Sequence, residues 1–457
     1  MPLIDRYIFH VYFRPLVGFI FFVHFSSSNL YASSSDNARF QNHEGVLLAQ
    51  RSDIDGAIRA FEEAFRNNPN DETIVSNLAT AYNNKGVNLV KSRNFSGALV
   101  EFKKAKTKKP EDIEIRFNLL NTLVSIRDLE QAHREAQSII FLRPRDPQTL
   151  LKIAGLFKKS EDFEFAQNLL ERVLELDSKN VPALLNLGQL FYHLGNLSGA
   201  RSCFEEVLEF SSGNASITEF LRRICREEEI QANFDSKNSV HFTITFENDG
   251  PKEWIDDLLE FFEEGYQKIG ELFNWYPSQR TQVIVYSRPQ FHKISFLPYW
   301  AGGLYDGKIR LPFPQGNTTP ANLRGAVFHE YCHHLVHILG NGRCPTWLNE
   351  GLAQLAEGVS IHSAKDILNK NPNFPLIQTK NFTSRFSHSK TRSEAERLYA
   401  QSLIAVSLIE EEKGLPGIRS IISFLGQGCS LDETLFEVLG KSCENLDKDI
   451  REFLDQP

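Results

Sequence analysis

Small and apolar residues recur at a fixed interval along the first half of the chain, from about residue 40 to residue 213. Five alanines lie 41, 34, 34 and 34 residues apart: Ala57, Ala98, Ala132, Ala166 and Ala200. Twelve residues before each of them is another small or apolar residue: Gly45, Gly86, Leu120, Ala154 and Gly188. Twelve residues after the first three alanines is a proline: Pro69, Pro110 and Pro144. A period of this length predicts stacked helix pairs, because one pair alone cannot bury its apolar face.

The period and its order of small, large and proline positions resemble tetratricopeptide repeats. The resemblance implies an all-α solenoid of about five repeats over residues 40–213. Seven extra residues between the first two alanines predict a lengthened helix around residues 74–82. Stacked repeats leave a concave groove, so we expect a protein or peptide partner there; the alternative is a spacer that holds the C-terminal half away from something else.

The pattern changes after the last repeat. Residues 214–239 are expected to be a linker, and Glu227, Glu228 and Glu229 within it are interpreted as a solvated face. Residues 240–246 then alternate like a strand, residues 254–273 have helical periodicity, and residues 282–286 form a second predicted strand. We therefore predict an α+β domain over residues 240–457.

Residues 302–312 have β character around an Asp-Gly turn. Two interpretations stay open for this segment. It is either a plain hairpin or a strand that borders a cleft and pairs with the backbone of a bound peptide.

A chemically distinctive motif lies in the apolar segment 323–339, which reads as a buried helix. His329 and His333 are four residues apart and therefore share one face, about 40° from each other, so both imidazoles can bind one metal ion. Glu330 points about 80° away from the middle of that face, where it is suited to act as a general base on a water molecule.

A hydrolytic zinc site needs three protein ligands and one open position. The loop 340–345 ends the first helix, and a second helix starting at Pro345 or Thr346 can return Glu350 to the metal. We therefore expect His329, His333 and Glu350 to bind Zn²⁺, with Glu330 as the base.

His-Glu-x-x-His at residues 329–333 and Trp-Leu-Asn-Glu-Gly-Leu-Ala at residues 347–353 resemble the motifs of the gluzincin metallopeptidases. The likeness is greatest to the peptidase-MA-like proteins and more distant to the M1 aminopeptidases, and it covers roughly residues 240–457. It implies the same three ligands and the same base. The aminopeptidase signature Gly-Ala-Met-Glu-Asn is absent, so aminopeptidase specificity is not implied. The resemblance also suggests that Tyr399 donates a hydrogen bond to a developing oxyanion; the alternative is an ordinary core or surface tyrosine.

The net charge and the composition of the N-terminus indicate which partners and which cellular compartment to expect. A net charge of −8 gives no reason to expect nucleic-acid binding. Residues 1–32 contain Arg6 and Arg14, an apolar core of about ten residues and a Ser-rich stretch ending at Ala32, the order of a secretory signal peptide. We expect an exported protein, periplasmic or secreted, cleaved near Ala32; the alternative is a retained N-terminal membrane anchor. The six cysteines are compatible with an oxidising compartment, but we expect small buried free thiols rather than disulfides.

The expected activity is zinc-dependent hydrolysis of peptide bonds in a protein or peptide substrate. Two other functions stay open: an inactive peptidase-like domain that serves a repeat scaffold, and a zinc hydrolase acting on a bond other than a peptide. The presence of all three ligands and the base favours the enzyme.

Overall fold

The computed structural model describes residues 34–456, apart from residues 211–213, 251, 296–302, 306, 315, 317, 371–375, 377, 383–385 and 387–390. The expected signal peptide, residues 1–32, lies outside the described residues. The chain divides into two compact units. One comprises residues up to Leu187 together with Glu206–Glu219, and the other comprises Gly188–Glu205 and Phe220–Pro457.

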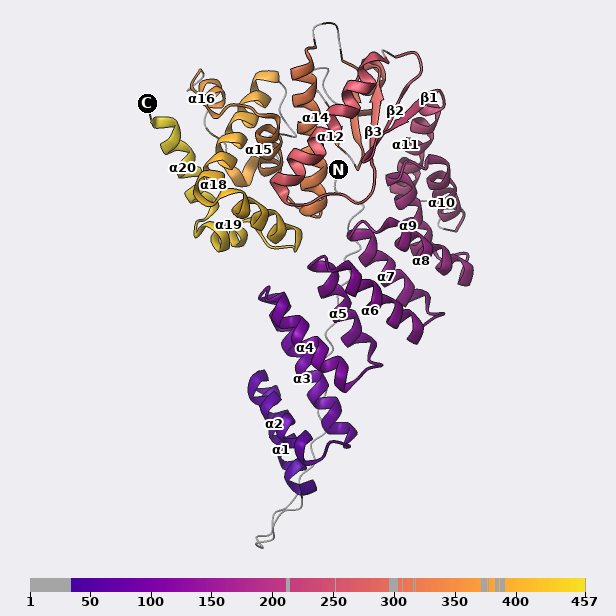
Figure 1. Cartoon of the computed structure of the whole chain (residues 1–457), viewed down its shortest axis with the longest axis vertical. Coiled ribbons are helices and arrows are strands. Elements are labelled where there is room, and N and C mark those ends of the chain that lie inside the picture. Colours follow the sequence, from indigo (N-terminus) through magenta and orange to yellow (C-terminus); the bar gives the residue numbers. More distant parts are fainter. Residues whose placement is uncertain are drawn as a thin grey trace. The chain divides into compact units, whose positions relative to one another are not determined.

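The first unit contains antiparallel helix pairs that follow one another along the chain (Figure 1). The first four pairs are α1 (Ser34–Gln50) with α2 (Ile54–Asn67), α3 (Glu72–Lys91) with α4 (Phe95–Lys108), α5 (Ile113–Ser125) with α6 (Leu129–Leu142), and α7 (Pro147–Lys159) with α8 (Phe163–Leu176). Helix α3 has 20 residues, whereas α5 and α7 have 13 each. The predicted lengthening by seven residues is therefore present in α3.

The turn inside each pair repeats the same local chemistry. The residue before each helix cap has a positive φ: Ser52, Arg93, Arg127 and Glu161. The next residue is an Asp or Asn whose side chain accepts a hydrogen bond from the first turn of the second helix, as Asp53 does from the Gly56 amide at 2.8 Å. Such caps satisfy amides that a helix start leaves unpaired.

Close packing within the pairs explains the periodic small residues. Ala57, Ala98, Ala132 and Ala166 have no exposed surface. At Gly86 a Cβ atom would lie only 2.6 Å from the Phe102 ring. The helices approach so closely because these positions carry no bulky side chain.

Helix α9 (Val181–His193) and helix α10 (Leu197–Phe210) form the fifth pair and are each divided between the two units. Residues 214–239, expected to be a linker, instead contain helix α11 (Ala215–Gln231) and strand β1 (Phe234–Asn238). Within the expected solvated face, Glu227 is only 1% exposed, while Glu229 is exposed. The cause is a pair of cations about 80 residues further along the chain, Lys308 and Arg310, which bind the Glu227 carboxylate.

The second unit is built around a five-stranded mixed sheet in the order β1-β2-β3-β5-β4. Strand β2 (Phe242–Glu247) pairs antiparallel with β1 and parallel with β3 (Thr281–Tyr286). Strand β5 (Ile309–Pro312) lies parallel to β3 and antiparallel to β4 (Leu304–Tyr305). Within the segment 302–312, residues 304–305 and 309–312 thus form an antiparallel pair of strands, and the first of the two is at an edge of the sheet; residues 302 and 306 lie outside the described residues.

Alternating side chains bury both faces of this sheet. One face, which includes Phe242 and Val283, packs in the main core with α12 (Glu253–Phe273) and the motif helix α14 (Pro320–Leu339). The other face carries Ile284 and Tyr286, which pack with Phe291 of α13 (Arg288–Ser295) and Ile230 of α11. Both faces of the sheet are therefore covered by helices.

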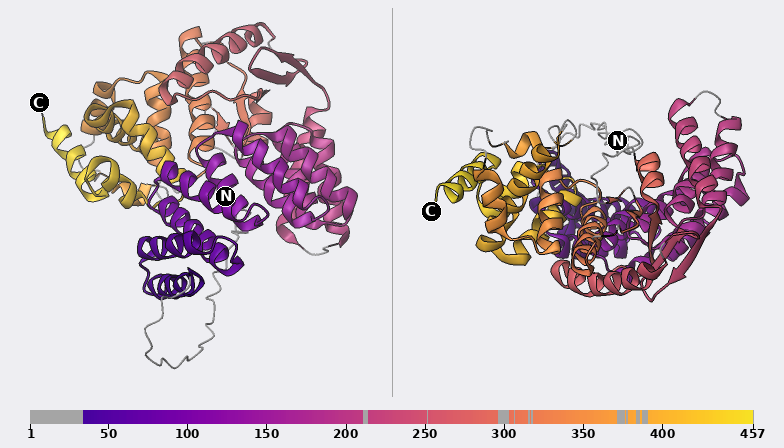
Figure 2. Two further views of the ribbon diagram at one scale, coloured as in Figure 1. Left: turned by 60° about the horizontal axis from the view of Figure 1, so that its bottom comes forward. Right: turned by 90° about the horizontal axis from the view of Figure 1, so that it is seen from above.

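The remaining helices of the second unit extend the core on the side of α14 away from the sheet (Figures 1 and 2). They are α15 (Thr346–Glu357), α16 (Ile361–Asn369), α18 (Arg392–Gly426), α19 (Leu431–Leu439) and α20 (Cys443–Asp455), with a short 3₁₀ turn, η1 (Thr379–Asn381). Helix α18 is interrupted at Gly414, where the backbone leaves helical geometry. The fold class is as predicted: an all-α repeat region followed by an α+β domain.

Two further findings concern membrane-spanning helices and the state of the cysteines. In the part of the chain that the structure describes, none of the helices has the length and apolar character of a membrane span. All six cysteines lie in described segments, and all are free thiols.

Candidate metal centre

Helix α14 presents the two motif histidines one turn apart. Thr319 caps its start by accepting a hydrogen bond from the Asn322 amide at 3.2 Å. The rings of His329 and His333 have centroids 4.7 Å apart and are nearly perpendicular. The helix ends in a turn in which Gly342 adopts a φ of 66°. This turn reverses the chain and allows the next helix to return along the first.

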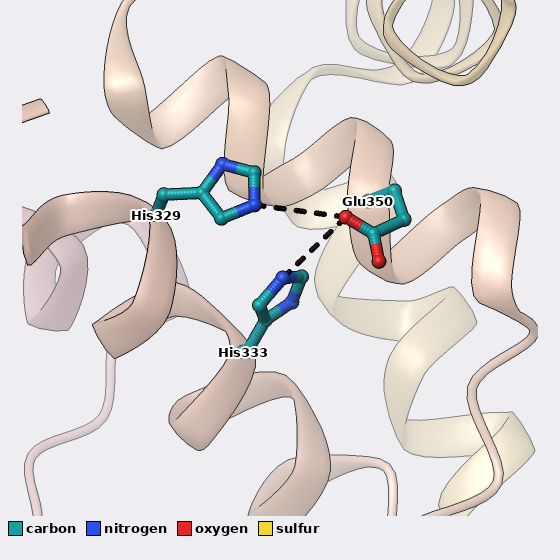
Figure 3. A group of neighbouring side chains, drawn as sticks. All are labelled: His329, His333 and Glu350. Carbon is teal, nitrogen blue, oxygen red and sulfur yellow. Dashed lines mark ion pairs between the residues drawn. The ribbon is translucent and has the colours of Figure 1, made fainter. Parts of the chain in front are cut away.

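Helix α15 brings Glu350 to the two histidines. Its inward face is fully buried through Trp347, Leu348 and Leu352. Gly351 allows α15 to contact α18 closely, because a Cβ atom there would lie 2.4 Å from the carbonyl oxygen of Ser402. With its helix fixed in this way, Glu350 faces both imidazoles (Figure 3).

The donor atoms of His329, His333 and Glu350 all lie within 4.8 Å of one another. The Oε2 atom of Glu350 is 3.6 Å from Nε2 of His329 and 3.4 Å from Nε2 of His333. Ligand atoms held about 2.0–2.1 Å from a tetrahedral zinc ion are about 3.4 Å apart. The separations from the carboxylate therefore match a zinc site closely.

The electrostatics of the three side chains also suit a cation. Burial alone would raise the pKa of Glu350, but His333 and His329 hold that pKa at about 2. Its Oε2 atom is buried and accepts no hydrogen bond from the described residues. A buried, ionised carboxylate oxygen without a hydrogen-bond donor is costly unless a cation compensates it. The residues present thus fit Zn²⁺ with two imidazole ligands and one carboxylate ligand.

A further acidic residue, Glu357, which the sequence interpretation missed, supports this group. Oε2 of Glu357, the last residue of α15, lies 3.0 Å from Nδ1 of His329. Burial would lower the pKa of His329, but Glu350 and Glu357 raise that pKa to about 10. A signal was available, because Glu357 follows Glu350 by seven residues and therefore lies on the same helix face.

Glu330 is buried but is not one of the three residues whose donor atoms converge. Its carboxylate lies against the backbone of Gly303, where a Cβ atom would be 2.4 Å from Oε1 of Glu330. Burial raises the pKa of Glu330, against the lowering effect of His333 and His329. A carboxylate with a raised pKa is a stronger base, which suits proton transfer.

Tyr399 lies beside the three converging residues on α18. Its ring centroid is 6.5 Å from that of His329 and 5.3 Å from that of Phe386. Burial raises its pKa, and the negative charges of Glu350 and Glu330 raise it further. The phenol therefore keeps its proton at neutral pH and is available as a donor.

Two neighbouring histidines, His334 and His337, make other contacts. His334 is buried on the side of α14 that faces the sheet, with Nε2 3.1 Å from the Thr281 hydroxyl and Nδ1 3.2 Å from the Tyr305 hydroxyl. Burial lowers the pKa of His334 to about 3, so its ring is neutral. His337 is exposed, and its ring packs against Tyr305. Neither residue belongs to the converging group.

Two family models match parts of the chain. Residues 264–456 match the family model of the Peptidase MA superfamily, and residues 158–223 match a tetratricopeptide-repeat model. No curated protein matches the chain significantly.

Several solved structures are similar over about two fifths of the chain. MamA 41-end from Desulfovibrio magneticus RS-1 is 17% identical over 39% of this chain and 98% of its own, with a TM-score of 0.30. TTC0263, a TPR protein of Thermus thermophilus, is 20% identical over 41% of this chain and 99% of its own, with a TM-score of 0.26. A tetratricopeptide repeat protein from Parabacteroides merdae is 16% identical over 42% of this chain and 75% of its own, with a TM-score of 0.32.

The two family matches fall on the segments whose sequence patterns predicted them, one on the later repeats and the other on the domain that contains the converging histidines and glutamate. The chain thus contains a tetratricopeptide repeat, followed by a C-terminal domain of the Peptidase MA superfamily.

Proposed function

We propose that the protein is a zinc-dependent metallopeptidase whose repeats bind protein or peptide partners. The observation that supports this most directly is the convergence of His329, His333 and Glu350 at separations suited to zinc, beside a buried fourth residue, Glu330. A domain that had lost catalysis would be expected to lack a ligand or the base, and all four residues are present.

Zinc held by His329, His333 and Glu350 would polarise the scissile carbonyl and make the attacking water more acidic. Glu330 takes the proton of that water on its carboxylate and returns it to the nitrogen of the leaving amine. Its raised pKa makes the carboxylate a stronger base for the first of these transfers. The phenol of Tyr399 keeps its proton and donates a hydrogen bond to the oxyanion that develops from the carbonyl.

Strand β4 is the proposed docking edge for the substrate. It is one of the two outer strands of the sheet and lies beside α14. An extended peptide that adds to this edge would gain backbone hydrogen bonds next to Gly303 and Glu330. Backbone pairing of this kind would favour a peptide over a substrate of another chemical class.

The proposed activity is tested by metal analysis and peptide-library cleavage with the full chain. The wild-type protein should hold about one zinc ion and cleave peptides. His333→Ala should lose the metal, while Glu330→Gln should keep the metal and lose turnover. Two exposed residues provide matched controls: His362→Ala and Glu411→Gln should behave like the wild type.

Three other outcomes of this experiment would each count against a different part of the proposal. Full zinc retention in His333→Ala would contradict the assigned ligands. A zinc-loaded wild type that cleaves no peptide would favour the alternative of an inactive peptidase-like domain in a binding scaffold. Cleavage that persists undiminished in Glu330→Gln would contradict the role of Glu330 as the base.

A further inference from the structure

A cluster of buried charged and phenolic side chains lies within the second unit, on the face of the sheet opposite to α14. Glu227 of α11 is at its centre and is 1% exposed. Its Oε1 atom accepts hydrogen bonds from Lys308 at 2.9 Å and from Arg310 at 3.2 Å. Its Oε2 atom accepts from Arg310 at 3.0 Å and from the Tyr192 hydroxyl at 2.8 Å. One carboxylate therefore holds two buried cations, which have no exposed side-chain surface.

The cluster connects elements that are distant in sequence. Tyr192 belongs to α9, the first helix of the fifth repeat pair, and its ring also lies 4.1 Å from the Lys308 ammonium. Arg310 donates to the Tyr286 hydroxyl of β3 at 2.6 Å. The end of the repeat region is thus tied to β3 and β5 through charge-assisted hydrogen bonds, which are the stronger class.

The two cations are on the strand that positions the edge of the sheet. Lys308 immediately precedes β5, and Arg310 is within it. In the described part of the chain, β5 is the only strand that pairs with β4, through Leu304 opposite Arg310 and Tyr305 opposite Ile309. Any movement of β5 is therefore passed to β4.

Strand β4 in turn contacts the helix of the metal centre at two points. Gly303, the residue before β4, lies against the carboxylate of Glu330. The Tyr305 hydroxyl lies 3.2 Å from Nδ1 of His334, the residue after His333. The position of β4 consequently determines what the base of the proposed reaction touches.

We propose that Glu227 is a positioning residue for the peptidase centre. By holding Lys308 and Arg310, it fixes β5 and hence β4 against Glu330. Helix α11, which follows the last repeat, then supports the proposed peptidase centre rather than acting as a linker. This inference rests on the proposed peptidase function for its kinetic consequences, but its structural consequence can be measured independently.

The test uses the full chain with Glu227→Gln, which keeps the shape of the side chain but leaves two cations without their counter-charge. Glu229→Gln, two residues away on an exposed position of α11, is the matched control. We expect Glu227→Gln to lower kcat on a short peptide by about tenfold or more, because small displacements of reacting groups are costly. KM should change less, zinc content should be unchanged, and hydrogen exchange at the amides of β4 and β5 should increase.

Two more variants keep the test decisive if Glu227→Gln folds poorly. Tyr192→Phe removes one hydroxyl and no charge, so it should change kcat and exchange in the same direction by a smaller factor. Adding Lys308→Met to Glu227→Gln restores the original net charge of the cluster and should recover part of both kcat and protection from exchange. Glu229→Gln should match the wild type throughout.

Unchanged exchange in β4 and β5 of Glu227→Gln would overturn the proposal. So would an increase spread evenly over the second unit, or a double variant that recovers nothing, because either would indicate only general destabilisation. If the wild type cleaves no peptide, the proposed function fails, yet the exchange measurement still decides whether Glu227 positions β4.

Discussion

Nδ1 of His329 lies 3.0 Å from Oε2 of Glu357, while Nε2 of the same ring faces Glu350. A carboxylate that accepts the Nδ1 proton fixes the tautomer of the ring and leaves Nε2 free to bind metal. Residues in this position are known to tune metal affinity without touching the metal.

Glu357→Gln is therefore expected to weaken zinc binding by about 10- to 100-fold while leaving the fold intact. The measurement is a competition titration against a chelator of known affinity. Glu411→Gln, an exposed glutamate on α18, should bind zinc as the wild type does. An affinity of Glu357→Gln equal to that of the wild type would show that the His329–Glu357 contact does not support the metal site.

The close packing of α15 on α18 gives a second prediction. In Gly351→Ala the new methyl group would meet the Ser402 carbonyl oxygen at 2.4 Å and the Val406 side chain at 2.6 Å. The two helices must separate, so we expect a loss of stability of about 1–3 kcal/mol. Urea unfolding followed by circular dichroism measures this loss.

Gly155→Ala is the control for that substitution, because no atom lies within 4 Å of the added methyl group. Alanine also has the higher helix propensity, so Gly155→Ala should be neutral or stabilising by up to about 1 kcal/mol. Equal stabilities for Gly351→Ala and the wild type would mean that α15 is not held against α18 as described.

The charged cluster at Glu227 predicts a dependence of stability on pH. Burial would raise the pKa of Glu227, but Arg310 and Lys308 lower it from 4.5 to about 2. A carboxyl group with a lowered pKa in the folded state stabilises the protein above its unfolded pKa, and this contribution is lost as pH falls from about 4.5 towards 2. At neutral pH Glu227→Gln should cost about 3–5 kcal/mol, because it leaves buried cations unpaired.

The measurement is the free energy of unfolding in urea at pH 7, 4.5 and 3 for the wild type and Glu227→Gln. The difference between the two proteins should be constant down to about pH 5 and should shrink below that. A difference that stays constant from pH 7 to pH 3 would mean that the pKa of Glu227 is the same in the folded and unfolded states, and therefore is not lowered by Arg310 and Lys308.

The convergence of His329, His333 and Glu350 could be predicted from sequence because its geometry is local. His329 and His333 share a helix face by simple periodicity, and only one short loop separates their helix from Glu350. The repeats could also be predicted from the sequence, because small residues recur wherever two helices approach closely. In both cases the sequence spacing nearly determines the spatial distance.

The role of Glu227 could not be predicted in the same way. Three consecutive glutamates on a helix are normally solvated, and nothing near them in sequence neutralises one of them. Lys308 and Arg310 lie more than 80 residues away and reach Glu227 only through the sheet topology. For the same reason residues 214–239 looked like a linker, because the partner surfaces of α11 and β1 are supplied by later parts of the chain.

Export remains a prediction that rests on residues 1–32, which lie outside the described residues. We expect mass spectrometry of the protein from its native host to show a mature N-terminus near Ser33. The reason is the order of basic, apolar and small residues in that segment. An intact Met1 in a cytosolic fraction would overturn this prediction, and an intact Met1 in a membrane fraction would favour the alternative of a retained anchor.

The last prediction concerns delivery of substrate by the repeats. A substrate captured by the repeats is tethered to the peptidase of the same chain, which raises its effective concentration to about the millimolar range for short tethers. A truncation that tests this must spare α9, α11 and β1, since Tyr192, Glu227 and the first strand belong to the second unit. A chain starting at Arg145 removes α1 to α6 and keeps these elements.

Delivery predicts that residues 145–457 and the full mature chain cleave short peptides at similar rates, because short peptides need no capture. On a protein substrate that binds the repeats, the truncated chain should lose about tenfold or more in kcat/KM. Circular dichroism and zinc content establish that the truncated chain is folded and loaded. Equal rates of both chains on the protein substrate would reduce α1 to α6 to a spacer or a localisation device, and a loss on short peptides as well would mean that these helices support the peptidase itself.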